Sequence, residues 1–204
     1  MRGAAGGPDA RGGATPDGPA IPAIPIRKAA RILSGGGVVA CPTEGVYGLS
    51  CLPGAPEAIR RVLEIKERRV SEGLILIAAS VAQLEPWAAL PEGAELPSGA
   101  ERPVTWLVPA RADVPYWIRG AHERVAVRVT AHPVAAALCI AAGSALVSTS
   151  ANVSGRPPAR TEHVLRRQFG RLVDYVVPGR PGPAKGPSEI RDFETGSIVR
   201  AAAT

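Results

Sequence analysis

Aromatic residues and cysteine are both scarce in this chain. Phe, Trp and Tyr make up 4% of the 204 residues and hydrophobic residues 46%, so the core must be built from Ala, Val, Leu and Ile, a composition suited to helices packed on a sheet. The three cysteines, Cys41, Cys51 and Cys139, include no Cys-x-x-Cys pair. Free thiols of this kind favour a reducing compartment, so we expect a cytoplasmic protein.

The signatures of several other protein classes are missing. No apolar run approaches the ~20 residues of a membrane span, and we expect no membrane association. Neither the phosphate-binding G-x-x-x-x-G-K-[ST] motif nor the G-x-S-x-G motif of serine hydrolases occurs. The cysteines have no histidine nearby at metal-ligand spacing, so no metal site built from protein ligands is assigned.

Lysine is rare as well, but the chain is basic. Lys28, Lys66 and Lys185 are its only lysines among 24 basic residues, and the formal net charge is +6. This balance favours anionic ligands, but it does not separate nucleic acids from small phosphates.

The chain divides into a short leader and one domain. Residues 1–20 contain six Gly and three Pro with no apolar core, which predicts a disordered leader. The remaining residues, 21–204, are enough for a single domain with a sizeable core. Its patterns predict helices at 26–34, from 56 onward, at 133–142 and at 162–169, and strands at 38–41, 74–77, 104–108, 125–129, 145–147 and 173–177. The alternation indicates an α/β or α+β fold.

A cluster of hydroxyl side chains follows one of these strands. Four hydroxyls and one amide lie within residues 148–155, directly after the apolar run 145–147. Such a segment can hold phosphate, carboxylate or a nucleotide without adding net charge. It can equally be a surface loop, and the segment alone leaves the two alternatives open.

Other polar residues also stand where apolar elements end. Lys66 continues the apolar face of the helix that begins near Pro56, so it either extends its ammonium to solvent or contacts a ligand. Thr43, Arg68 and Ser188 lie at further element ends, and open α/β sheets bind their ligands at such ends.

Seven motifs, taken in order from about residue 25 to residue 200, resemble those of the YrdC-like family. They are Pro42-Thr43-Glu44-Gly45-Val46-Tyr47-Gly48-Leu49, Lys66-x-Arg68, Gly73-Leu74-Ile75-Leu76-Ile77, Pro103-Val104-Thr105, Val127-Arg128-Val129-x-x-His132-Pro133, Ser148-Thr149-Ser150-Ala151-Asn152-x-Ser154-Gly155 and Pro187-Ser188-Glu189-Ile190-Arg191-Asp192. The first motif departs at Gly45, where the family commonly has Ala or Thr.

The resemblance implies a fold and an activity. The fold would be a single domain with a twisted, open, mixed sheet and flanking helices around a concave, positively charged cavity. The activity would be synthesis of threonylcarbamoyl-AMP and pyrophosphate from L-threonine, bicarbonate and ATP. A downstream transferase complex would then modify the adenosine beside the anticodon in tRNA, and contact with tRNA itself would not be required.

The resemblance also implies residue roles. Lys66 and Arg68 would stabilise charge in the reaction, with no general base assigned. ATP or AMP would be bound by Arg68, Thr105, Ser148, Ser150, Asn152, Ser188 and Arg200. Threonine and bicarbonate would be bound by Thr43, Lys66 and Arg128. Mg²⁺ would accompany ATP, held mainly by phosphates and water.

The basic charge leaves an alternative: a protein that binds double-stranded RNA or tRNA, or assists ribosome maturation, without turnover. The scarcity of aromatic residues and the absence of a Lys/Arg run interleaved with aromatics weaken the case for sequence-specific RNA reading.

Overall fold

The computed structural model describes residues 23–202, and the leader predicted for residues 1–20 lies outside them. The helices are α1 (Ala23–Ser34), α2 (Pro56–Lys66), α3 (Tyr116–Arg119), α4 (Pro133–Ala142) and α5 (Glu162–Phe169), with short 3₁₀ turns at Val70–Glu72 and Val81–Gln83. The strands are β1 (Val39–Pro42), β2 (Tyr47–Cys51), β3 (Ile75–Ala78), β4 (Val104–Pro109), β5 (Arg124–Val129), β6 (Leu146–Ser150), β7 (Tyr175–Val176), β8 (Glu189–Asp192) and β9 (Ile198–Arg200).

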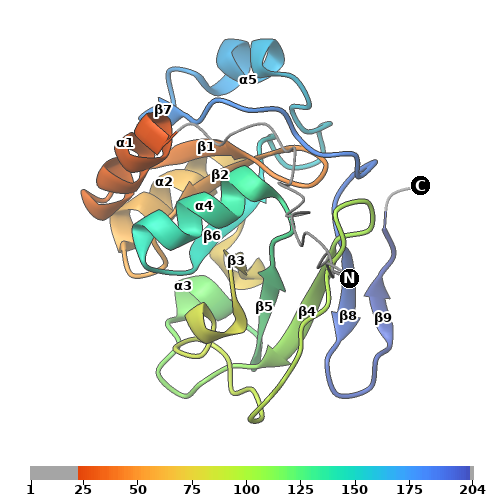
Figure 1. Cartoon of the computed structure of the whole chain (residues 1–204). Coiled ribbons are helices and arrows are strands. Elements are labelled where there is room, and N and C mark those ends of the chain that lie inside the picture. Colours follow the sequence, from red (N-terminus) through yellow and green to blue (C-terminus); the bar gives the residue numbers. More distant parts are fainter. Residues whose placement is uncertain (1–22, 203–204) are drawn as a thin grey trace, which may run out of the picture.

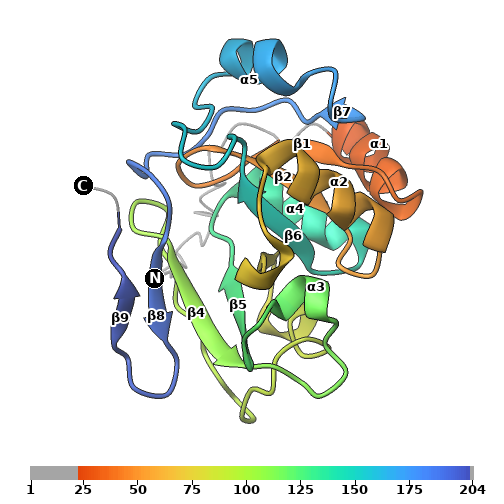
Figure 2. The same cartoon turned by 180° about the vertical axis from the view of Figure 1, so that it is seen from behind.

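The strands form one mixed sheet in the order β7-β1-β2-β6-β3-β5-β4-β8-β9. Pairing is parallel for β1 with β7, β3 with β5 and β4 with β8, and antiparallel elsewhere. Figures 1 and 2 show the sheet twisting from β1, β2 and β6 to the β8–β9 hairpin. The predicted twisted, open, mixed sheet is therefore confirmed.

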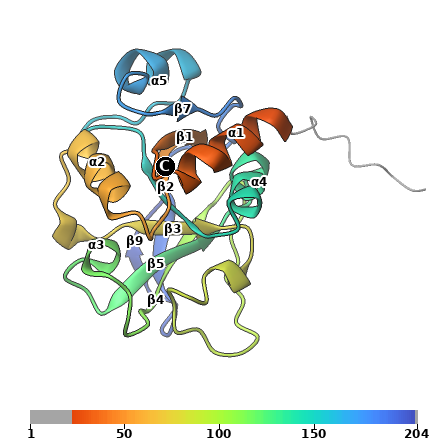
Figure 3. The same ribbon diagram turned by 90° about the vertical axis from the view of Figure 1, so that its left-hand side faces the viewer.

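Helices cover both faces of the first half of the sheet. Figure 3 shows α1 and α4 on one side of it and α2 and α3 on the other. Successive strand residues point to opposite faces, so in β1 Ala40 joins the core under α2, whereas Val39 and Cys41 join the core under α1 and α4. This two-sided burial explains why β1 and β3 read as continuous apolar runs.

The predicted bounds of the helices agree with the structure better than those of the strands. The bounds predicted for α4 and α5 agree with the structure, and α2 begins at Pro56 as expected. In α5, the side chain of Thr161 accepts a hydrogen bond from the Val164 backbone, as N-cap residues do. Within residues 23–202 no helix has the length and apolar character needed to cross a membrane.

One prediction about the hydroxyl-rich segment was wrong in detail. Ser148, Thr149 and Ser150 are not in a loop after a strand: they are the last three residues of β6 and pair with Ser50, Leu49 and Gly48 of β2. The end of the strand could not be recognised from the sequence, because the apolar pattern stops where β6 reaches the cavity described below.

Candidate active site

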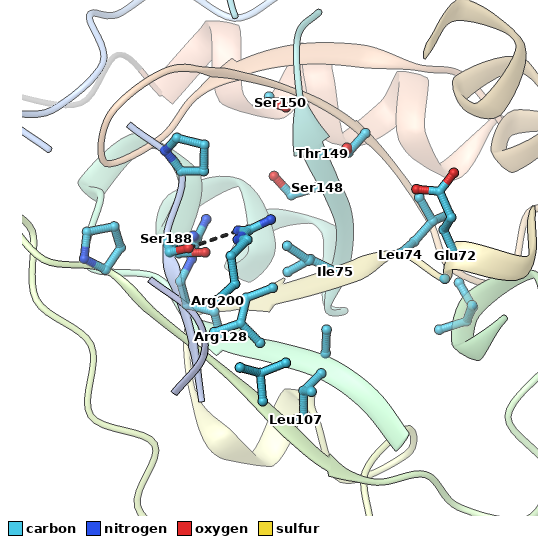
Figure 4. Close-up of a pocket in the computed structure, with 18 of the residues that line it drawn as sticks. Glu72, Leu74, Ile75, Leu107, Arg128, Ser148, Thr149, Ser150, Ser188 and Arg200 are labelled. Carbon is cyan, nitrogen blue, oxygen red and sulfur yellow. Dashed lines mark hydrogen bonds between the residues drawn. The ribbon is translucent and has the colours of Figure 1, made fainter. Parts of the chain in front are cut away.

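A cavity of about 670 Å³ opens between the Thr43–Val46 turn, the end of β6, β5 and the β8–β9 hairpin. Figure 4 shows Ser148, Arg128, Ser188 and Arg200 around the same space, although they come from four different strands or strand ends. The order of strands in the sheet therefore brings together residues that lie far apart in the sequence.

Seven of the residues predicted for the site line this cavity: Thr43, Arg68, Arg128, Ser148, Ser150, Ser188 and Arg200. The other three lie behind its wall, and each is hydrogen-bonded to a serine that lines it. Lys66 Nζ donates to the carbonyl of Ser150, Asn152 Oδ1 accepts from the Ser150 hydroxyl, and the Thr105 hydroxyl lies 2.7 Å from that of Ser188. The ten residues thus form a lining and a supporting layer.

Three guanidinium groups converge on the cavity. Arg68 follows α2, Arg128 lies in β5 and Arg200 ends β9. Arg200 is exposed as a residue, but its guanidinium donates to the carbonyl of Ser188 at 2.8 Å. Burial first, and then the positive charges of Arg68 and Arg128, lower the pKa of Arg200. Cations held this close together are suited to binding an anion.

The ammonium of Lys66 is held at the end of α2. A left-handed residue, Glu67, ends the helix, and Lys66 Nζ lies 2.9 Å from Asn152 Oδ1 and 3.1 Å from the Asn152 carbonyl. Burial first, and then the charge of Arg68, lower the pKa of Lys66 to about 8. Only 2% of the residue is exposed, so the alternative in which its ammonium extends to solvent is wrong.

Two glycines allow close contacts in the cavity wall, one with a lining hydroxyl and one with a backbone carbonyl. A Cβ on Gly48 would come within 2.9 Å of the Ser148 hydroxyl, and a Cβ on Gly45 within 2.6 Å of the Ala184 carbonyl. The second contact arises because residues 182–184 pack on the Thr43–Gly45 turn, where the Gly182 amide donates to the Thr43 carbonyl. The Pro/Gly-rich stretch from 178 to 187 therefore borders the site.

Sequence reasoning missed several lining residues. Glu44 is almost fully buried and pairs with Arg128 at 3.2 Å. An apolar part of the cavity wall is formed by Leu74, Ile75, Leu107, Ile118 and Ile190, and a polar part by Arg119, His122, Glu123 and Arg124. The apolar residues resemble ordinary core residues in the sequence, so no local signal could have identified them.

The remaining chemistry of the described residues is limited. Burial raises the pKa of Cys51 and Cys139 to about 12 and that of Cys41 further, so none supplies a thiolate at neutral pH. Between residues 23 and 202 there is no group of three His, Cys, Asp or Glu side chains placed to hold a metal ion. The site offers hydroxyls and cations, which suit binding and charge neutralisation.

Comparison with known proteins identifies relatives of this chain. A family model described as "Telomere recombination", named for Sua5, YciO and YrdC, matches residues 31–202. A protein of Nitrosococcus oceani named threonylcarbamoyl-AMP synthase is 55% identical over 89% of this chain and all of its own length. A protein of Methylococcus capsulatus with the same name is 51% identical over 86% of this chain and 96% of its own.

Solved structures agree on the fold. P. abyssi Sua5 complexed with L-threonine matches with a TM-score of 0.76 and 32% identity, over 85% of this chain and 52% of that one. E. coli YciO, at 21% identity, shares the fold with a TM-score of 0.74 over 87% and 89% of the two chains. With the family model covering most of the domain and relatives above 50% identity, this chain belongs to the Sua5/YciO/YrdC family.

Proposed function

We propose that this protein is a threonylcarbamoyl-AMP synthase, which forms threonylcarbamoyl-AMP and pyrophosphate from L-threonine, bicarbonate and ATP. One observation carries the proposal: guanidinium groups and hydroxyls from separate strands converge on one cavity in a chain whose relatives of that name match over nearly their full length. The cavity is within the usual size range of small-molecule sites, about 300–1,000 Å³.

The reaction joins two steps. The amine of threonine attacks the carbon of bicarbonate, and loss of water leaves a carbamate. A carbamate oxygen then attacks the α-phosphorus of ATP, the bond to the bridging oxygen breaks, and pyrophosphate leaves with its electron pair. Both steps gather anions in one place, so positioning and charge neutralisation are the chief contributions expected of the protein.

The lining residues have roles that fit this chemistry. Arg68 and Arg200 would bind ATP phosphates, with the hydroxyls of Ser148, Ser150 and Ser188 beside them. Arg128 and Thr43 would hold threonine and bicarbonate. Three predicted residues lie behind the lining: Lys66, Thr105 and Asn152. They would act on ATP through the hydrogen bonds that they make with Ser150 and Ser188. Alternatively, they would contact ATP themselves once the 150–154 segment adjusts around the triphosphate.

Mg²⁺ would enter with ATP. Three carboxylates line the cavity, and two of them, Glu44 and Glu72, are paired with arginine, which leaves Glu123. One carboxylate does not make a set of ligands, so the phosphates and water would supply most of the oxygen ligands of the ion. When bound, Mg²⁺ neutralises charge on the triphosphate.

The product would pass to a downstream transferase complex that modifies tRNA. Contact with tRNA remains an additional proposal, since net charge alone favours it. The three free, buried cysteines support a cytoplasmic location.

The test is direct. Purified protein is incubated with ATP, Mg²⁺, labelled bicarbonate and L-threonine, and labelled threonylcarbamoyl-AMP and pyrophosphate are measured, with reactions lacking threonine as blanks. Arg200→Ala should lower turnover, whereas Arg167→Ala, at an exposed position on α5, should not. No product from the intact protein, together with tight, salt-sensitive binding to RNA, would instead support the RNA-binding alternative.

A further inference from the structure

Glu44 is a buried carboxylate in the wall of a cavity where the other charged groups are mostly cations. It follows Thr43 in the turn between β1 and β2, and only 1% of it is exposed. Its Oε1 accepts hydrogen bonds from the Thr130 hydroxyl at 2.7 Å and from the Ala131 amide at 3.0 Å. Thr130 and Ala131 directly follow β5, so Glu44 ties the β1–β2 turn to the end of that strand.

The other carboxylate oxygen of Glu44 faces Arg128. Oε2 lies 3.2 Å from Arg128 Nη2, and neither Oε2 nor Arg128 Nε has a further hydrogen-bond partner among the described residues. The Arg128 side chain is 9% exposed. The pair engages one end of the guanidinium through Nη2, and Arg128 also lines the cavity.

We propose that Glu44 is a positioning residue: it fixes the Arg128 guanidinium so that its free N–H groups receive the carboxylate of L-threonine. The inference rests on the proposed function, in which Arg128 binds threonine. Arg68 and Arg200 carry like charge toward the same cavity, so an unanchored Arg128 would be pushed away from them. An anchored planar guanidinium presents its donors in the two-pronged arrangement that matches a carboxylate.

A direct role of Glu44 as a base toward the threonine amine is less favourable. Its second oxygen, Oε2, is shielded from solvent and faces Arg128. Burial raises the pKa of Glu44. Arg128 and the Thr130 and Ala131 donors lower that pKa by more than burial raises it, so the net direction is downward. A carboxylate held in its charged form orients a cation well and takes up a proton poorly.

Thr130 gives a test that leaves both charges in place. Thr130→Val keeps the shape of the side chain but removes the hydroxyl that holds Glu44, and Thr130→Ser keeps that hydroxyl. Thr130 does not line the cavity, so its effect on substrate must pass through its neighbours. We expect Thr130→Val to raise the KM for L-threonine about tenfold, with the KM for ATP and kcat within about twofold, and Thr130→Ser to restore the KM.

Glu44→Gln should raise the KM for threonine further if that variant folds. Adding Thr130→Val to Arg128→Lys should raise the KM for threonine much less than adding it to the wild type, because the guanidinium it orients is gone. Two outcomes for Thr130→Val would overturn the positioning role. One is an equal rise in both KM values together with a fall in kcat, and the other is an unchanged KM for threonine. Absence of turnover in the wild type would instead refute the proposed function, so the two failures are distinguishable.

Discussion

The ammonium of Lys66 lies 2.9 Å from the side-chain oxygen of Asn152 and 2.6 Å from the carbonyl of Ser150. The end of α2 thereby holds the segment that leaves β6 and enters the cavity wall. A second link involves only the main chain of the lysine, because its carbonyl accepts hydrogen bonds from the amide and the hydroxyl of Ser154. The effect of the Lys66 charge can therefore be separated by mutation from the anchoring of this segment.

Lys66→Ala should lower turnover by about 100-fold or more while the protein stays folded, because it removes a cation but keeps the main-chain link to Ser154. Four polar contacts are lost, but their partners, Ser150 and Asn152, are only half-buried. The expected loss of unfolding free energy is therefore only about 1–2 kcal/mol. Product formation and urea unfolding measure the two quantities. Full activity would show that Lys66 is only a structural support.

Binding of ATP should take up protons near pH 8. Burial and Arg68 lower the pKa of Lys66 to about 8 in the free protein, so roughly half of these lysines are neutral at that pH. Nearby phosphate charge favours the ammonium and raises its pKa, which draws a proton from the buffer. Calorimetry of ATP binding in buffers of different ionisation enthalpy should show an uptake of up to about 0.5 proton. The uptake should vanish near pH 6 and in Lys66→Ala; equal uptake in that variant would assign the protons to another group.

The hydroxyls of Thr105 and Ser188 should be energetically coupled. They lie 2.7 Å apart with both residues buried, and they join the parallel strand β4 to the start of β8. Thr105→Val and Ser188→Ala should each cost about 1–2 kcal/mol of unfolding free energy, because each leaves a buried hydroxyl without its partner. The double variant should cost less than the sum by about 1 kcal/mol in urea unfolding. Strict additivity would mean that the two hydroxyls do not depend on one another.

Much of the fold could be predicted because its helices carry clear local signals. In α4 and α5, proline, a threonine cap and flanking glycines mark the ends. β2 was missed because Gly48 and Ser50 interrupt its apolar pattern, and β9 because its three residues are all exposed. β2 lies inside the sheet between β1 and β6, whereas β9 is a short edge strand, specified by pairing with β8, that carries little signal of its own.

The site was predictable to a different degree. Its hydroxyls and cations could be named from motifs, but their convergence depends on the strand order β6-β3-β5-β4-β8, which no local pattern encodes. The supporting layer was also beyond reach, since nothing in the sequence says that Thr105 meets Ser188 or that Glu44 meets Thr130. Such contacts follow only from tertiary packing.

Gly45→Ala should disturb the site. In this chain the added Cβ would lie 2.6 Å from the Ala184 carbonyl and 2.9 Å from that of Gly186, so the backbone of residues 184–186 would have to move. We expect a loss of about 1–3 kcal/mol and a higher KM for substrate. Gly54→Ala is the matched control, because its Cβ would meet no atom within 4 Å. Thermal unfolding and steady-state kinetics compare the two, and equal behaviour would contradict the close approach.

Arg128→Met should be among the most damaging single changes to stability. It leaves the carboxylate of Glu44 buried without its cation, at a cost of about 3–5 kcal/mol at pH 7. In the wild type the net pKa of Glu44 is lowered, so its contribution to stability is present at neutral pH and is lost as pH falls below the ordinary glutamate range. In Arg128→Met the main lowering influence is gone and burial raises that pKa, so the carboxyl can take up a proton on mild acidification. The deficit measured by urea unfolding should therefore shrink from pH 7 to pH 5, and adding Glu44→Gln should recover part of it at pH 7. A deficit that is the same at both pH values and unrelieved by Glu44→Gln would mean that the loss comes from packing of the arginine side chain and not from the buried charge.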